Sequence, residues 1–163
     1  MTTMPMTTRW GCMKLPAWDS LPDFGLYMDQ MTSYADRCFA GLLPPEQHMI
    51  TSAMINNYVK SGLMDRPQGK KYGRDSIGQM LMICILKQTT AMDALKLLLH
   101  RADGTTAEQL YHVFCTTQER IAADFATLDA PPDPLTCALE ASSYQFLCQE
   151  LLVRESAVPE PEA

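Results

Sequence analysis

The spacing of apolar and polar residues along the chain predicts a mainly helical protein. From Phe24 to Cys38, apolar and aromatic residues recur every few positions, which is the period of a helix with one buried face. A second, shorter helix is predicted over residues 51–60, because the Thr51 hydroxyl can cap its first turn. Gly62 follows it and can adopt the positive φ with which many helices end.

The middle of the chain contains its most apolar segment, Met80–Leu86. A helix that begins near Asp75, ends near Lys87 and is apolar on all sides belongs at the centre of a fold, although a buried strand has the same pattern. Another short helix is predicted over residues 92–101. Turn-forming residues within 63–72 predict a small β-hairpin in front of these helices.

The C-terminal part is predicted to form two helices that pack back on the rest of the protein. Thr105 and Glu108 have the spacing of a capping box that opens the first of them. Its inward side is expected to consist of Leu110, Phe114, Ile121, Phe125 and Leu128. Three prolines then precede a last helix over 135–154, whose large apolar residues include Leu135, Leu139, Phe146, Leu147 and Leu151.

The length of 163 residues suits a single folded unit, since domains commonly have about 100–200 residues. Within it we distinguish an N-terminal extension (1–19), a helical module (20–101), an acidic helical region (102–154) and a tail (155–163). The tail is rich in proline and glutamate, so it is predicted to be disordered.

Charge is distributed unevenly along the chain. The net charge of −6 argues against a protein that coats a polyanion. However, residues 48–101 contain eight cations and three acids, whereas residues 102–163 contain two cations and eleven acids. A basic middle segment followed by an acidic one is compatible with a small nucleic-acid-binding surface on one side of the protein, despite the negative net charge.

The basic segment contains a polar helix followed by a basic hairpin. Asparagine amides can bond to an adenine edge in the major groove, and lysine, arginine and tyrosine side chains supply phosphate contacts. A helix followed by a basic hairpin is the arrangement of a winged helix-turn-helix. The candidate DNA-binding residues are Ser52, Asn56, Asn57, Tyr58, Lys60, Lys70, Lys71, Tyr72 and Arg74.

Several of these residues also have a purely structural interpretation. Tyr58 suits a core position, the two asparagines can mark fraying before Gly62, and Lys70-Lys71 can be a solvated turn. Their clustering in a short stretch of an otherwise acidic chain favours the joint interpretation as a binding surface.

The same stretch resembles the DNA-binding half of MerR-like transcriptional regulators. The motifs that carry this resemblance are Tyr58-Val59-Lys60-Ser61-Gly62-Leu63-Met64, Arg66-Pro67, Lys70-Lys71-Tyr72 and Arg74. Together with Leu26-Tyr27-Met28-Asp29-Gln30 and the run Met54 to Lys60, they also resemble a bacterial family described as domain of unknown function 1836. The resemblance implies a MerR-like winged helix-turn-helix with additional C-terminal helices.

We therefore expect a sequence-specific protein that binds double-stranded DNA and regulates transcription. A homodimer formed through the C-terminal helices would double its DNA contacts. The alternative is a helical protein–protein interaction adaptor that does not bind DNA. DNA binding would weaken steeply with salt, which separates the two.

Other classes of function find little support in the sequence. No catalytic motif is present, so no enzyme activity, metal or cofactor is predicted; His112 and Cys115 alone are too few ligands for a metal. The six cysteines show no disulfide framework and the first residues show no signal peptide, which predicts a cytoplasmic protein. The longest apolar run, Met80–Leu86, is too short to span a membrane.

Overall fold

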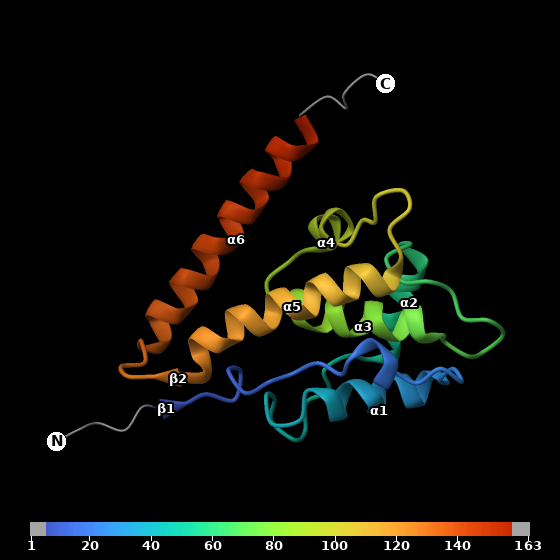
Figure 1. Ribbon diagram of the computed structural model, residues 1–163, viewed down its shortest axis with the longest axis horizontal. Helices are drawn as coiled ribbons and strands as arrows, with labels where there is room; N and C mark the ends of the chain where they lie inside the picture. The colour runs from blue at the N-terminus through green and yellow to red at the C-terminus, as the bar shows by residue number, and fades with distance from the viewer. Residues whose placement is uncertain (1–5, 158–163) are drawn as a thin grey trace.

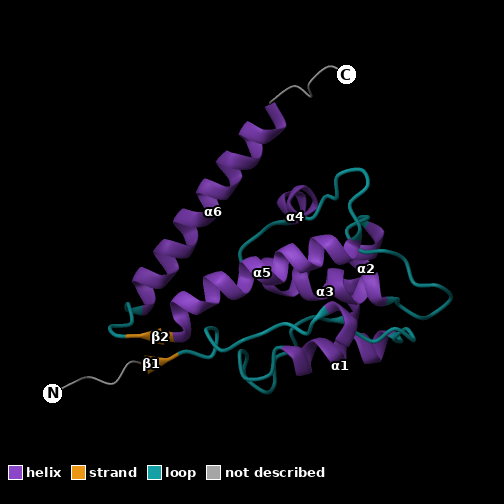
Figure 2. Cartoon of the chain, viewed as in Figure 1, coloured by secondary structure: helices purple, strands orange, loops and turns teal. Residues whose placement is uncertain are grey.

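The computed structural model describes residues 6–157, and over that range the protein is mainly helical, as predicted (Figure 1). The helices are η1 (Trp18–Ser20, a single 3-10 turn), α1 (Met28–Cys38), α2 (Ser52–Lys60), α3 (Arg74–Leu86), α4 (Met92–Leu98), α5 (Ala107–Ala126) and α6 (Pro134–Ala157). Two very short strands, β1 (Met6–Thr7) and β2 (Thr127–Leu128), pair antiparallel at the C-terminal end of α5 (Figure 2).

Helix α3 lies at the centre of the fold. Every residue from Ser76 to Cys84 is buried, and the helix packs against both α1 and α5. Because a helix that is apolar all round has no face suited to water, it is stable only when neighbours surround it. The prediction of a central helix is confirmed, and the alternative of a buried strand is wrong.

The close packing around α3 depends on Gly78. A Cβ atom at this position would lie 2.9 Å from the Trp18 ring and 3.3 Å from the Tyr111 ring. The two ring centroids are 5.5 Å apart, and the Tyr111 hydroxyl donates a hydrogen bond to the carbonyl of Pro16 over 2.7 Å. Leu15, just before this contact, is only 3% exposed. The end of the predicted N-terminal extension is therefore built into the core.

Helix α1 begins later than the apolar spacing predicts. Gly25 has φ of +78°, which is outside the helical region and suits glycine. The helix starts at Met28, where the Gln30 side chain accepts a hydrogen bond from the Tyr27 backbone N–H over 2.9 Å. Phe24, expected on the buried side of this helix, is instead 70% exposed.

Residues 39–51 connect α1 to α2 in an irregular segment that is tied to α1 through Asp36. One carboxylate oxygen of Asp36 lies 2.7 Å from Nδ1 of His48, and the other accepts a hydrogen bond from the Met49 backbone N–H over 2.9 Å. The adjoining residues Met49 and Ile50 are buried. The connection is much longer than the turn of about three or four residues in a regular helix-turn-helix.

Two isolated backbone bridges replace the regular hairpin predicted over residues 63–72. They join Leu26 to Tyr72 and Gln68 to Lys71. The described residues of this segment form no two-stranded sheet. The described residues thus confirm a mainly helical fold, whereas the winged helix-turn-helix stays a prediction.

The capping of α5 differs by one residue from the prediction. The Thr106 hydroxyl accepts from the Gln109 backbone N–H over 3.1 Å, and the Gln109 side chain accepts from the Thr106 backbone N–H over 2.9 Å. The predicted pair, Thr105 and Glu108, lies one position earlier. Both pairs fit the same sequence pattern, which explains the error.

The buried side of α5 is also rotated relative to the prediction. Tyr111, Gln118 and Ala122 are buried against the core, whereas Ile121 and Phe125, expected inside, are 44% and 43% exposed. Consequently α5 presents an apolar strip on its outer side.

Helix α6 contacts the rest of the protein sparsely: none of its residues is buried, so the close packing predicted for it is not found. It diverges from the end of α5 and contacts the region of α4 (Figure 1). Its start is fixed by Asp133, whose carboxylate accepts from the backbone N–H groups of Leu135 and Thr136. It extends to Ala157, so the start of the predicted tail is helical, and residues 158–163 lie outside the described range.

All six cysteines are free thiols, with Cys84 buried in α3. Among the described residues, no helix has the length and apolar character needed to cross a membrane.

Candidate nucleic-acid interface

The outer side of α2 is a polar strip. The Thr51 hydroxyl caps the helix by accepting from the Met54 backbone N–H over 3.2 Å. Ile55 and Tyr58 point into the core, and this fixes which residues face solvent. The outward strip consists of Ala53, Asn56, Asn57 and Lys60, all exposed, with Ser52 exposed at the helix start.

The segment of residues 65–73, which we call the basic loop, forms a tight turn beside α2. Gln68 and Lys71 exchange backbone hydrogen bonds of 2.9 and 3.2 Å across the tip, where Gly69 has φ of +63°. At its base, Tyr72 and Leu26 exchange backbone hydrogen bonds of 2.8 and 2.9 Å. These four bonds hold Lys70 at the exposed tip of the loop.

Lys71 is also exposed, but it is held in place by an aromatic ring. Its Nζ lies 5.3 Å from the centroid of the Tyr27 ring, at the start of α1. A cation over an exposed ring gains about 0.5–1 kcal/mol. The Lys71 ammonium group is therefore positioned over Tyr27 while remaining accessible to an anion.

The two candidate tyrosines of the site are largely buried. Tyr58 is 8% exposed and Tyr72 is 4% exposed, and burial raises the pKa of both hydroxyls. Among the described residues, neither hydroxyl is a fully buried group without a partner. Their rings therefore act as core, and only the hydroxyl of each remains for a polar contact.

Arg74 is engaged with the backbone of its own chain. Its Nε and Nη2 atoms both donate to the carbonyl oxygen of Leu21, at 3.2 and 3.1 Å, and Nη2 lies 4.0 Å from Asp23. This bifurcated contact anchors the segment before α1 to the start of α3. The structure thus gives Arg74 a structural role that its sequence context did not reveal.

Two hollows flank the basic loop and bring the other candidates together. The α1-side hollow, about 670 Å³, is lined by Ser52 and Lys70 together with Asp29. The α2-side hollow, about 620 Å³, is lined by Asn56, Asn57, Lys60 and Arg66. Pro67 and Tyr72 line both hollows and form the wall between them.

The α2-side hollow has the chemistry of an anion-binding surface. It contains two cations, Lys60 and Arg66, and two side-chain amides, and no acid is among its lining residues. Arginine can bind phosphate or a guanine edge through two parallel hydrogen bonds. The α1-side hollow is less favourable to an anion, because Asp29 partly offsets Lys70.

Sequence reasoning did not select Arg66 and Tyr27 as site residues. Arg66 directly precedes Pro67 in the basic loop, so its position between the two clusters of candidates was the available signal. Tyr27 carried no such signal, since its contact with Lys71 depends on the bridge between Leu26 and Tyr72.

A metal centre is not apparent in the part of the chain that the structure describes. No group of three or more histidine, cysteine, aspartate or glutamate side chains there is arranged to hold an ion. His112, one of the two residues weighed for that role, is exposed on α5.

These features define a small helical protein with a polar, basic surface built by α2 and the basic loop. The chain belongs to the family described as domain of unknown function (DUF1836), whose model matches residues 16–114. The resemblance to domain of unknown function 1836 seen in the sequence is thereby confirmed. No curated protein and no solved structure matches the chain. The matched range includes α1 to α4 and the first part of α5, so the surface lies inside it and α6 lies outside it.

Proposed function

We propose that this protein binds double-stranded DNA in a sequence-dependent manner and regulates transcription, with α2 in the major groove and the basic loop on the phosphate backbone. The observation that carries the proposal is the convergence of α2 and the basic loop on the α2-side hollow, which combines amides and cations without an acid. Amides can read base edges, whereas cations attract phosphates.

Each side chain then has a role that suits its chemistry. Asn56 and Asn57 bond to base edges, because they lie on the outward strip of α2. Lys60, Arg66 and Lys70 bind phosphates, since they are exposed and make no recorded ion pair within the described chain. Lys71, Ser52 and the two tyrosine hydroxyls contribute secondary phosphate contacts.

The arrangement is a variant of a MerR-like winged helix-turn-helix. The long connection over residues 39–51 replaces the short turn, and the basic loop with its two bridges takes the place of a regular wing. The first is fixed to α1 through Asp36, and the second is fixed through Leu26 to the segment just before α1. Helix α2 is therefore held rigidly enough to present a defined outward strip.

A homodimer formed through the C-terminal helices is part of this proposal. A single module with few base contacts seldom supplies enough affinity, and two-fold symmetry doubles those contacts. No catalytic activity is part of it.

Selection of bound duplexes from a random pool tests the proposal directly. We expect enrichment of a defined motif, arranged as a palindrome if the protein binds as a dimer. An Asn56→Ala, Asn57→Ala double variant should lose the motif preference while it retains salt-sensitive binding to DNA. Lys14→Ala, which removes an exposed cation far from the basic loop in sequence, is the matched control and should bind as the wild type does.

The rival function is a helical adaptor that binds another protein and no DNA. It is favoured by the exposed apolar residues of α6, which suit a protein partner. The absence of any retained duplex at low salt, with a correctly folded protein, would exclude DNA binding and leave the adaptor.

A further inference from the structure

Helix α6 carries apolar residues that its own chain leaves exposed. Leu135, Leu139, Phe146 and Val153 are 69%, 59%, 72% and 69% exposed. Their separations of four, seven and seven residues place them on one stripe of the helix, the spacing of a helix–helix contact. We call these four residues the outer stripe.

The outer stripe does not face the body of the same chain. In the second half of α6 the half-buried residues are Gln145, Cys148 and Leu152, and the Gln145 side chain lies 3.4 Å from the hydroxyl of Thr90, just before α4. At about 100° per residue these three positions lie on a different side of α6 from the outer stripe. The outer stripe is therefore available to a second molecule while α6 keeps its contact with α4.

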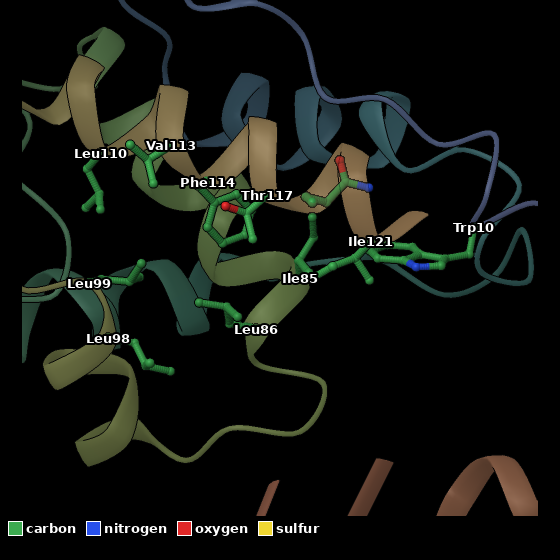
Figure 3. Close-up of a pocket in the computed structure, with 11 residues that line it drawn as sticks. Trp10, Ile85, Leu86, Leu98, Leu99, Leu110, Val113, Phe114, Thr117 and Ile121 are labelled. Carbon is green, nitrogen blue, oxygen red and sulfur yellow. The ribbon is translucent and has the colours of Figure 1, made fainter. Parts of the chain in front are cut away.

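An apolar groove lies between α5 and the C-terminal ends of α3 and α4 (Figure 3). It has a volume of about 360 Å³, and its walls include Ile85, Leu86, Leu99, Val113, Phe114 and Ile121. No residue of α6 lines it. Val113, on its α5 wall, is 62% exposed. The same chain thus offers an unfilled apolar groove and an unpartnered apolar stripe.

The accessible surface of the chain indicates how much area is left to bury. It is 11192 Å², whereas a compact protein of 18.3 kDa exposes about 8,100 Å². Counting all residues outside 6–157 as fully accessible explains at most roughly 1,800 Å² of the difference. A surplus of more than roughly 1,000 Å² therefore remains, and a standard interface takes about 800 Å² from each partner.

Charge favours a contact between these two surfaces. Residues 85–101, which supply four apolar lining residues of the groove, contain three cations and one acid: Lys87, Lys96, Arg101 and Asp93. Helix α6 has the opposite balance, with three acids and one cation: Glu140, Glu150, Glu155 and Arg154. Opposite net charge on the two segments favours their approach.

We infer that the occupant of the groove is α6 of a second copy of this chain, so that two molecules exchange their outer stripes reciprocally. Such an exchange is isologous: each copy gives one stripe and one groove, and the assembly closes as a dimer. The inference rests on the dimer named in the proposed function and specifies the surfaces that form it. Its outcome is measured without DNA, so its failure is separable from failure of DNA binding.

Sedimentation equilibrium of the full chain tests the assembly. We expect a monomer–dimer equilibrium between about 1 and 100 µM, the range in which a modest interface becomes populated. A monomer throughout this range would show that α6 folds onto its own groove or stays free. Growth into larger oligomers would show an open, non-reciprocal contact. Either result overturns the inference.

Two substitutions with nearly equal starting exposure test the outer stripe. Phe146→Glu should raise the dissociation constant of the dimer by at least about 100-fold, because symmetry removes two buried rings at once. Phe24→Glu changes a ring that is 70% exposed, against 72% for Phe146, at the other end of the chain. This control should leave the dissociation constant within about twofold, and an equal loss in both variants would contradict the assignment.

A mixing experiment distinguishes exchange into the groove from pairing of α6 with α6. Val113→Glu, which damages only the groove, should weaken self-association as Phe146→Glu does. A mixture of the two variants restores one intact stripe facing one intact groove, so mixed dimers should form more tightly than dimers of either variant alone. If Val113→Glu dimerises like the wild type, the groove is not the binding surface. Thermal unfolding is compared at a concentration at which the wild type and both variants are monomeric; because both side chains start exposed, an unchanged midpoint there rules out misfolding as the cause.

Discussion

The salt dependence of DNA binding can separate the cations of the proposed interface one at a time. Four cations of the basic segment are exposed on α2 and the basic loop: Lys60, Arg66, Lys70 and Lys71. Each phosphate neutralised on duplex DNA contributes about −0.9 to the slope of log K against log salt concentration. If all four bind phosphates, each copy of the protein contributes a slope of about −3.6.

Arg66→Ala is the most informative change. It removes one cation from the α2-side hollow without a contact to the core, because Arg66 is exposed. We expect the slope to become less steep by about 0.9 per bound copy, with affinity reduced on all duplexes alike. Fluorescence anisotropy with a labelled duplex between about 50 and 200 mM salt measures the slope directly.

Arg74→Gln provides the matched comparison. The sequence suggests the same phosphate role for this arginine, but its guanidinium group donates twice to the Leu21 carbonyl. Its loss should therefore lower the free energy of unfolding, by about 1–3 kcal/mol for a charged donor, and leave the salt slope unchanged at temperatures where the variant is folded. A slope unchanged in Arg66→Ala, or a loss of slope in Arg74→Gln, would refute the assignment of roles.

Three further predictions concern the core. Gly78→Ala should destabilise the protein by up to about 2 kcal/mol, because the clash with the Trp18 ring outweighs a gain of about 1 kcal/mol in helix propensity. Urea unfolding of a double-mutant cycle tests this cause, since Trp18→Leu should reverse much of the loss. Tyr111→Phe should cost about 1 kcal/mol, since the Pro16 carbonyl loses its donor, and an unchanged melting temperature would show that water replaces the hydroxyl. Burial raises the pKa of the Cys84 thiol from 9.0 to about 12. Above pH 9 the thiol ionises in the unfolded chain but stays protonated in the folded one, so the free energy of unfolding declines between pH 9 and 12, by about 1 kcal/mol per pH unit, and is unaffected below pH 9. Cys84→Ala should flatten this part of the curve of unfolding free energy against pH, although it lowers stability at neutral pH.

The parts of the fold that the sequence predicts well are those where one pattern has only one stable outcome. The apolar run of α3 is stable only when other parts of the chain surround it, and its residues up to Cys84 are all buried. Ile55 and Tyr58 fix the inward side of α2, so the outward positions of Asn56 and Asn57 follow from the helical period. Both results depend on local spacing alone.

The errors arise where the pattern fits several outcomes. Thr105 and Thr106 each have a suitable partner three residues later, and only the structure shows that Thr106 is used. A guanidinium group suits a phosphate or a backbone carbonyl equally, so Arg74 could not be assigned from residue type. The direction of α6 was equally open, because apolar residues indicate that a helix needs a partner without naming it.

The two proposals fit together through the eight cations of residues 48–101. Four lie on α2 and the basic loop, and a fifth, Arg74, is engaged with Leu21. The remaining three, Lys87, Lys96 and Arg101, belong to residues 85–101, the segment that supplies Ile85, Leu86, Leu98 and Leu99 to the groove proposed to receive the acidic α6 of a second copy. Exchange of α6 would offset the positive charge there and leave α2 and the basic loop as the basic surface of the module. A protein with a net charge of −6 would then attract DNA from one direction, the one in which α2 presents its asparagines.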